Sequence, residues 1–143
     1  MSLRSAEVVA EARRWLGTPY RHQASLCGAG CDCLGLLRGV WRAVVGPEPE
    51  ALPPYRASLR DIVSASALEM TADRLLDRTI QSPGAGRVVL FRMRTDLPAK
   101  HCGILTGEDR FIHAQEGLGV IEAPIGGWEA RISRYFDFPV RAD

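Results

Sequence analysis

The feature that most constrains the fold is a change in the spacing of apolar residues partway along the chain. In the first half, apolar side chains recur every three or four residues, the period of helices that bury one face. From about residue 87 the pattern becomes short runs of β-branched and aromatic residues separated by turn residues. Helices followed by strands, with no helix between the strands, predict an α+β domain whose sheet packs on a helical half.

The first half predicts three helices. The first is capped by Ser5 and stops at Gly17, and its repeating apolar residues are Val8, Val9, Ala12, Trp15 and Leu16. The second runs from Cys33 to Val45, where Gly46 and Pro47 end it. A proline-rich connector, residues 47–55, leads to the third, from about Ser58 to Leu76.

The second half predicts about five antiparallel strands in a meander. They cover residues 87–93, 101–107, 110–114, 119–123 and 135–140. Residues 17–32 carry glycines, a proline and small polar residues without periodicity, so they predict a loop. A chain of 143 residues fits one domain, and we expect residues 1–143 to form it.

Composition excludes several classes of protein. The formal charge is +1 and the arginines are scattered, so no basic surface for nucleic acid is expected. No run approaches the roughly 18 apolar residues of a membrane span. Glu7 and Glu11 interrupt the apolar pattern near the start, unlike a secretory signal. We therefore expect cytoplasmic synthesis, without a signal peptide or a membrane partner.

Three of the four cysteines, Cys27, Cys31 and Cys33, lie within seven residues. With His22 they are of the type that zinc accepts, but their spacing differs from the paired C-x2-C of zinc knuckles. A disulfide would close a very short loop and would need an oxidising compartment. Free cysteines are usually small buried hydrophobes, the reading we favour for Cys27, Cys31 and Cys102. No metal or cofactor is expected.

Cys33 differs from its neighbours because it follows Asp32, a good N-cap residue. It would then occupy the first helical position, where free N–H groups and the helix dipole favour an anion. A thiol placed there ionises more readily, and the thiolate is the nucleophile. The same N–H groups can donate to an oxyanion, and Gly35 leaves room for a substrate backbone.

A nucleophilic thiol needs a base, and the chain has three histidines. His22 lies in the cysteine loop and is expected to line the substrate groove. His101 begins one predicted strand and His113 ends the next, so a hairpin brings them close. An odd-length turn at residues 107–109 places both on one face. We expect His101 to take the thiol proton and His113 to orient its ring.

With these residues in place, the chain resembles the NlpC family of papain-like cell-wall peptidases. The resemblance is carried by the segments ARRWLGTPYRHQ (12–23), GCDCLGLL (30–37), GRVVLF (86–91), KHCGILTG (100–107) and FIHA (111–114). It spans nearly the whole chain and is strongest to members from phage and gene-transfer particles. The resemblance implies a papain-like fold, with N-terminal helices on a C-terminal antiparallel sheet.

The resemblance also implies an activity and the residues that perform it. Cys33 is the nucleophile, His101 the base and His113 the third, polar member, while Tyr20 shapes the site and donates to the oxyanion. The substrate is the peptide stem of peptidoglycan, cut between D-γ-glutamate and diaminopimelate through an acyl-enzyme. Tail proteins of a phage-like particle are the implied partners, with action at the cell wall.

Two residues depart from the family pattern. Leu34 stands where serine is usual, and Arg87 replaces an aspartate at the start of a strand. Because of the second change, the substrate contacts of the family are not assumed for this chain. Cys102, beside the base, is read as a small inward-facing residue. Three alternatives stay open: an inactive structural subunit of a particle tail, a metal-binding module built on His22 and the loop cysteines, and an amidase or acyltransferase on another acyl substrate.

Overall fold

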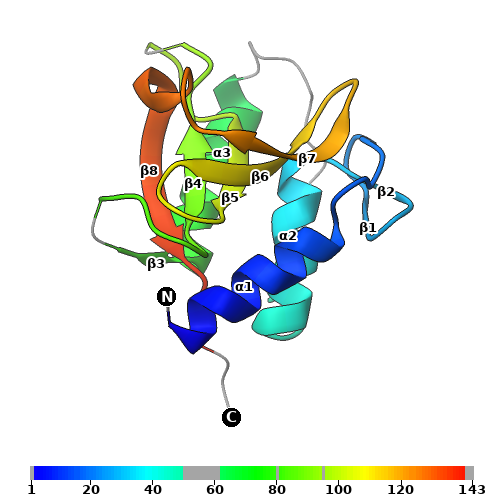
Figure 1. The fold of residues 1–143 in the computed structure, drawn as a ribbon. Helices are drawn as coiled ribbons and strands as arrows, with labels where there is room; N and C mark the ends of the chain where they lie inside the picture. Colours follow the sequence, from blue (N-terminus) through cyan, green and yellow to red (C-terminus); the bar gives the residue numbers. More distant parts are fainter. Residues whose placement is uncertain (1, 50–61, 80, 95, 141–143) are drawn as a thin grey trace.

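The computed structural model describes residues 2–49, 62–79, 81–94 and 96–140, with the backbone alone for 62–67. The predicted cap at Ser58 and most of the proline-rich connector lie outside these residues. Figure 1 shows the helices gathered against a central sheet. The helices are α1 (Leu3–Arg14), α2 (Cys33–Val44) and α3 (Ile62–Leu75). The prediction of an α+β domain is confirmed.

The main sheet has six strands in the order β3-β8-β4-β5-β6-β7. Its strands are β3 (Asp77–Arg78), β4 (Val88–Phe91), β5 (His101–Leu105), β6 (Arg110–Gln115), β7 (Gly119–Pro124) and β8 (Ile132–Asp137). Strands β4 to β7 form the predicted meander. The prediction of five strands missed β3, because two residues carry no periodicity. It also placed the last strand three residues too late, and β8 returns to lie between β3 and β4.

Two local predictions in the first helix were wrong. Ser2, and not Ser5, is the N-cap, because the Ser2 hydroxyl accepts the Ser5 N–H at 3.0 Å. Leu16 follows the helix and is 41% exposed, although the helical period predicted it on the buried face. The loop at residues 17–32 also contains a short hairpin, β1 (Ser25–Leu26) with β2 (Gly30–Cys31).

Alternate residues of β4 pack on opposite faces of the sheet, as strand geometry requires. Val88 and Leu90 face the helices, and Val89 and Phe91 face away from them. Helix α2 packs against β5 and β6, and its Leu36 and Val40 are completely buried. Burying a leucine side chain contributes about 2 kcal/mol, so this contact holds the start of α2 against the sheet.

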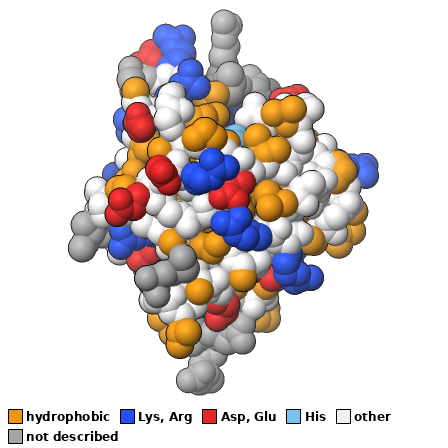
Figure 2. Space-filling model, in the orientation of Figure 1, with side chains coloured by type: hydrophobic (Ala, Val, Ile, Leu, Met, Phe, Trp, Pro, Cys, Tyr) orange, Lys and Arg blue, Asp and Glu red, His pale blue; other side chains and the backbone are white. Residues whose placement is uncertain are grey.

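Charged side chains of both signs alternate on the face drawn in Figure 2. Glu122 of β7 pairs with Arg13 of α1 and Arg110 of β6. Exposed pairs of this kind contribute roughly 0–1 kcal/mol each. Within the described residues, no helix has the length and apolar character needed to cross a membrane.

Candidate active site

Cys33 is the first residue of α2, and Asp32 is its N-cap, as predicted. The buried Asp32 carboxylate accepts the Gly35 N–H at 2.7 Å through Oδ1 and the Gln23 N–H at 2.7 Å through Oδ2. One side chain therefore fixes both the helix start and the preceding loop. Because the Asp32 carbonyl also accepts the Leu36 N–H, the Cys33 and Leu34 amides are the donors left at the helix start.

Gly35 is required by packing against the loop. A Cβ at this position would lie 1.9 Å from the Ala24 carbonyl oxygen, much closer than real atoms approach. Gly35 is buried, and its N–H is committed to Asp32. Its observed role is to bring the loop onto the helix start, and a contact with substrate stays a prediction.

His101 and His113 meet across the β5–β6 hairpin. In this hairpin Ile104 pairs with Ile112, and Leu105 pairs with Phe111. Continuing this register by one residue places Gly103 directly opposite His113. His101 then lies diagonal to His113 on the same face of the sheet. The three-residue turn at 107–109 gives the predicted common face. His101 Nε2 lies 2.7 Å from His113 Nδ1. The opposite residue is glycine, so His113 has room to reach the diagonal ring.

His101 and Cys102 are neighbours on β5, and both lie close enough to Cys33 to affect its ionisation. The pKa of Cys33 is lowered well below the usual value, first by a hydrogen bond from the Cys102 thiol and then by the hydrogen bond and charge of His101. Burial and the Asp32 carboxylate act in the opposite direction. Because His113 engages Nε2 of His101, the nitrogen left to face the thiolate is Nδ1.

His113 is buried, with 1% of its surface exposed. Burial, and then the neighbouring His101, lower the pKa of His113 from 6.5 to about 3. It is therefore neutral at physiological pH, and its Nδ1 is the acceptor of this pair whenever His101 carries a proton on Nε2. This hydrogen bond fixes the orientation of the His101 ring.

Tyr20 lies at the end of the loop, where it bridges to Cys31 and packs against the helix-facing core. Burial, and then the charges of Cys33 and Asp32, raise the pKa of Tyr20 to about 12. Its hydroxyl therefore stays protonated and remains a donor. The structure thus brings Tyr20, Asp32, Cys33, His101 and His113 to one place.

The sequence analysis missed Trp128, which stacks on His101 with ring centroids 5.6 Å apart and planes 28° apart. Phe91 and Phe111 also contact the imidazoles, and Phe111 stacks on His113 at 4.3 Å between centroids. These rings shield the two histidines on the face away from the helices. A tryptophan after two glycines carries no periodicity, so the sequence offered no signal beyond the residue type.

The other candidate residues of the loop, Cys27, Cys31 and His22, do not gather at one point. Cys27 is exposed, which corrects the prediction that it is buried, and its thiol donates to the Arg14 carbonyl at 3.3 Å. Cys31 is buried as predicted, and burial is the main cause that raises its pKa to about 12. The exposed His22 has Nδ1 3.8 Å from Asp32 Oδ2. Among the described residues, no three His, Cys, Asp or Glu side chains converge as metal ligands do.

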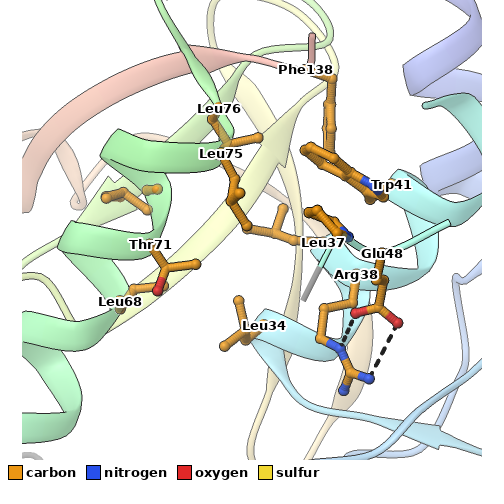
Figure 3. Close-up of a pocket in the computed structure, with 13 residues that line it drawn as sticks. Leu34, Leu37, Arg38, Trp41, Glu48, Leu68, Thr71, Leu75, Leu76 and Phe138 are labelled. Atoms are coloured by element: carbon orange, nitrogen blue, oxygen red, sulfur yellow. Dashed lines mark hydrogen bonds and ion pairs between the residues drawn. The ribbon is translucent and has the colours of Figure 1, made fainter. Parts of the chain in front are cut away.

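Leu34 directly follows Cys33 and lines an apolar pocket between α2 and α3 (Figure 3). The pocket has a volume of about 70 Å³, and Leu37, Trp41, Leu75 and Phe138 also line it. A dry cavity of about 150 Å³ holds one benzene, so this pocket has room for only a small apolar group. The leucine at this position therefore lines a pocket beside the candidate site.

Arg87 lies at the other end of β4 from the site. Phe91 pairs with His101, and Arg87 is four residues earlier, roughly 13 Å along an extended strand. Its guanidinium donates to the Ser82 carbonyl at 3.0 Å and pairs with Asp137 at 3.5 Å. These contacts connect a turn to β8. Arg87, which departs from the family pattern, is therefore distant from His101 and His113.

Comparisons with known proteins support this fold. A sequence model of the NlpC/P60 family matches residues 17–135. The fold is similar to the NlpC/p60 domain of the peptidoglycan hydrolase SagA, with a TM-score of 0.64, 23% identity, and coverage of 95% of this chain and 100% of that one. No curated protein sequence matches the chain.

Two longer proteins share the fold. NlpC2 from Trichomonas vaginalis has a TM-score of 0.67 at 16% identity, with 96% of this chain and 48% of that one covered. An NlpC/P60 family protein from Bacillus cereus has a TM-score of 0.64 at 16% identity, with 92% and 39% covered. The chain thus spans less than half of either, and likeness at these identities establishes the fold.

Proposed function

The chain belongs to the NlpC/P60 family, and we propose that it is a cysteine peptidase that hydrolyses the peptide stem of peptidoglycan. The observation that carries this proposal is the Cys33 thiol at a helix start, near an imidazole that lowers its pKa and that lies 2.7 Å from a second histidine. SagA, whose domain has the same fold, is described as a peptidoglycan hydrolase. The proposed bond joins D-γ-glutamate to diaminopimelate.

In the first step, the Cys33 thiolate attacks the carbonyl carbon of the scissile amide. The carbonyl oxygen becomes an oxyanion, and in this proposal the Cys33 N–H and the Tyr20 hydroxyl stabilise it. Protonated His101 gives its Nδ1 proton to the leaving amine as the C–N bond breaks. The product is a thioester on Cys33 and a neutral His101.

In the second step, neutral His101 takes a proton from water as the water oxygen attacks the thioester. The C–S bond then breaks, the carboxylic acid leaves, and the Cys33 thiolate and the His101 imidazolium are restored. His113 stays neutral throughout, because its pKa of about 3 lies far below the working range. Its Nδ1 holds the His101 ring in the orientation that both steps need.

The test is digestion of defined muropeptides, with the products identified by mass spectrometry. The wild-type protein should release fragments cut at the γ-D-glutamyl-diaminopimelate bond. Cys33→Ala should abolish this release. The matched control is Cys27→Ala, which removes an exposed thiol of the same loop that makes no contact with the site and should keep full activity.

Two outcomes would contradict the proposal. Equal activity in wild type and Cys33→Ala would remove Cys33 as the nucleophile. Cleavage at a different bond would keep the chemistry and reject the proposed specificity. An inactive wild type whose Cys33 also reacts slowly with iodoacetamide at neutral pH would instead support a structural subunit of a particle tail.

A second candidate is an amidase or acyltransferase acting on another acyl group, and the apolar pocket beside Cys33 favours it. Leu34 directly follows the nucleophile and lines that pocket, whose volume of about 70 Å³ suits a short aliphatic group. A series of p-nitrophenyl esters of increasing chain length separates the two functions. A maximum at two to four carbons, with no turnover of muropeptides, would select the second.

The setting in which the protein works stays a prediction from the sequence resemblance. We propose cytoplasmic synthesis, association with tail proteins of a phage-like particle, and action at the cell wall. Co-purification of the protein with particles from an induced culture tests this association. A protein found only in the soluble fraction of cells that release particles would contradict it.

A further inference from the structure

Arg131 is an exposed cation whose guanidinium lies over the ring of Trp128, beside the candidate site. Its Cζ is 5.6 Å from the Trp128 ring centroid, within the range of cation–π attraction. The Trp128 ring also stacks on His101, with centroids 5.6 Å apart. Because both separations end on the same ring, the Arg131 guanidinium lies within about 11 Å of the His101 ring. No step of the proposed reaction uses this charge.

The backbone holds Arg131 at the end of the sheet where His101 begins its strand. Arg131 directly precedes β8, and its carbonyl accepts the N–H of the residue after β4 at 2.7 Å. Ile132 of β8 pairs with Phe91 of β4, and Phe91 pairs with His101 of β5. The register between β4 and β8 shifts at this point, and such bulges re-aim side chains beside active sites.

The charge of Arg131 has no acidic partner within the described part of the chain. Other exposed arginines are paired, as Arg134 is with Asp73 at 3.4 Å and Arg94 with Asp96 at 3.1 Å. Among the residues that the structure describes, no carboxylate oxygen lies within 4.0 Å of the Arg131 guanidinium. A guanidinium can bind a carboxylate through two parallel hydrogen bonds. Arg131 is therefore available to an anionic group of a substrate.

The proposed substrate carries carboxylates at a matching distance from the scissile bond. Its glutamate is linked through the γ-carbonyl, so the α-carboxylate stays free, and the side-chain carboxylate of diaminopimelate is free as well. Four bonds separate the scissile carbonyl carbon from the glutamyl α-carboxylate carbon, which is roughly 5 Å in an extended chain. A hydrogen bond spans about 3 Å more to a guanidinium nitrogen. A carbonyl bound beside His101 can therefore bring a carboxylate within reach of Arg131.

We propose that Arg131, held on the Trp128 ring, is a specificity-determining residue that binds a carboxylate of the stem peptide next to the scissile amide. The inference rests on the proposed peptidase function, because it names the group that the same site recognises. The carboxylate does not change during the reaction, so Arg131 binds it equally in the ground state and the transition state. Such binding lowers KM and leaves kcat nearly unchanged.

The experiment compares the hydrolysis of three stem peptides by the complete chain. One peptide carries both carboxylates that flank the scissile amide. The second has the glutamyl α-carboxylate replaced by a primary amide, and the third has the side-chain carboxylate of diaminopimelate replaced in the same way. The amide that lowers kcat/KM identifies which carboxylate Arg131 binds.

We expect the wild type to prefer the first peptide over one of the amides by about 5- to 15-fold in kcat/KM. This range lies between the effect of an exposed ion pair and that of a hydrogen bond to a charged group. Most of the difference should appear in KM. The preference should also shrink when the salt concentration rises from about 0.02 to 0.5 M, because exposed charges are screened.

The key variants change the charge of Arg131. Arg131→Gln removes it and should abolish the preference, whereas Arg131→Lys keeps a charge without the planar fork and should retain part of it. The matched control is Arg134→Gln, which removes an arginine of β8 that pairs with Asp73 and should keep the preference of the wild type. Circular dichroism and a thermal melt confirm that each variant is folded.

The outcomes separate this inference from the proposed function. Hydrolysis of all three peptides by the wild type with the same kcat/KM would overturn the role of Arg131 and leave the peptidase in place. A preference that Arg131→Gln retains, or that Arg134→Gln loses to the same extent, would also overturn it. A wild type that hydrolyses none of the three peptides would contradict both proposals.

Discussion

His101 Nε2 and His113 Nδ1 lie 2.7 Å apart, although the two residues are diagonal and not directly opposite in the β5–β6 hairpin. Gly103, directly opposite His113, makes this contact possible. A Cβ on Gly103 would lie 2.9 Å from the Phe111 ring and 3.2 Å from the His113 Cβ. The site therefore depends on a residue without a side chain between the two imidazoles.

Removing the acceptor on His113 should impair the reaction while leaving the nucleophile. His113→Ala loses a hydrogen bond to a group that becomes charged, which contributes about 1.5–3 kcal/mol, so kcat should fall roughly 10- to 150-fold. His113→Asn keeps an acceptor and should recover part of the rate. Muropeptide turnover measures both, and equal rates in the two variants would contradict an orienting role.

His113 should also make the fold sensitive to acid. Its pKa falls from 6.5 in the unfolded chain to about 3 in the folded protein, so between these values only the unfolded chain binds the proton. The stability present above pH 6.5 is therefore lost as the pH falls, by about 3 kcal/mol between pH 7.5 and pH 4. Urea unfolding should show that loss in the wild type and a loss smaller by this amount in His113→Gln.

Adding one methyl group at Gly35 should destabilise the protein. The Cβ would meet the Ala24 carbonyl oxygen at 1.9 Å, so the loop must move and the Asp32 cap is strained. We expect Gly35→Ala to lower the free energy of unfolding by about 3 kcal/mol. Gly107→Ala is the matched control, because nothing lies within 4 Å of its Cβ. Equal stability of the two variants in urea would exclude this packing role.

Trp128 should stabilise the imidazolium of His101 through the face of its ring. The centroids lie 5.6 Å apart in a stacked arrangement, within the range of cation–π attraction. Trp128→Leu should lower kcat/KM by about 2- to 30-fold, corresponding to roughly 0.5–2 kcal/mol. Trp128→Phe should retain more activity than Trp128→Leu. If leucine supports the same rate as phenylalanine, the ring contributes by packing alone.

Periodicity predicted the elements because it reports which face of a local segment is buried. It predicted that α2 begins at Cys33 with Asp32 as the cap, and it predicted the hairpin that brings the two histidines together. It failed where the signal was too short or depended on a distant partner. The two-residue β3 has no period, and Leu16 follows the helical spacing after the chain has already turned away.

The sequence by itself determined the order of elements and the chemical types available: one thiol at a helix start and two histidines on a hairpin. Only the tertiary structure decided that Cys102 lies close enough to Cys33 to affect its ionisation, that Trp128 stacks on His101, and that Cys27 is exposed. The physical reason is that a helix start or a turn depends on interactions within a few residues. Contacts between segments roughly 30 to 70 residues apart depend on how the helices and the sheet pack.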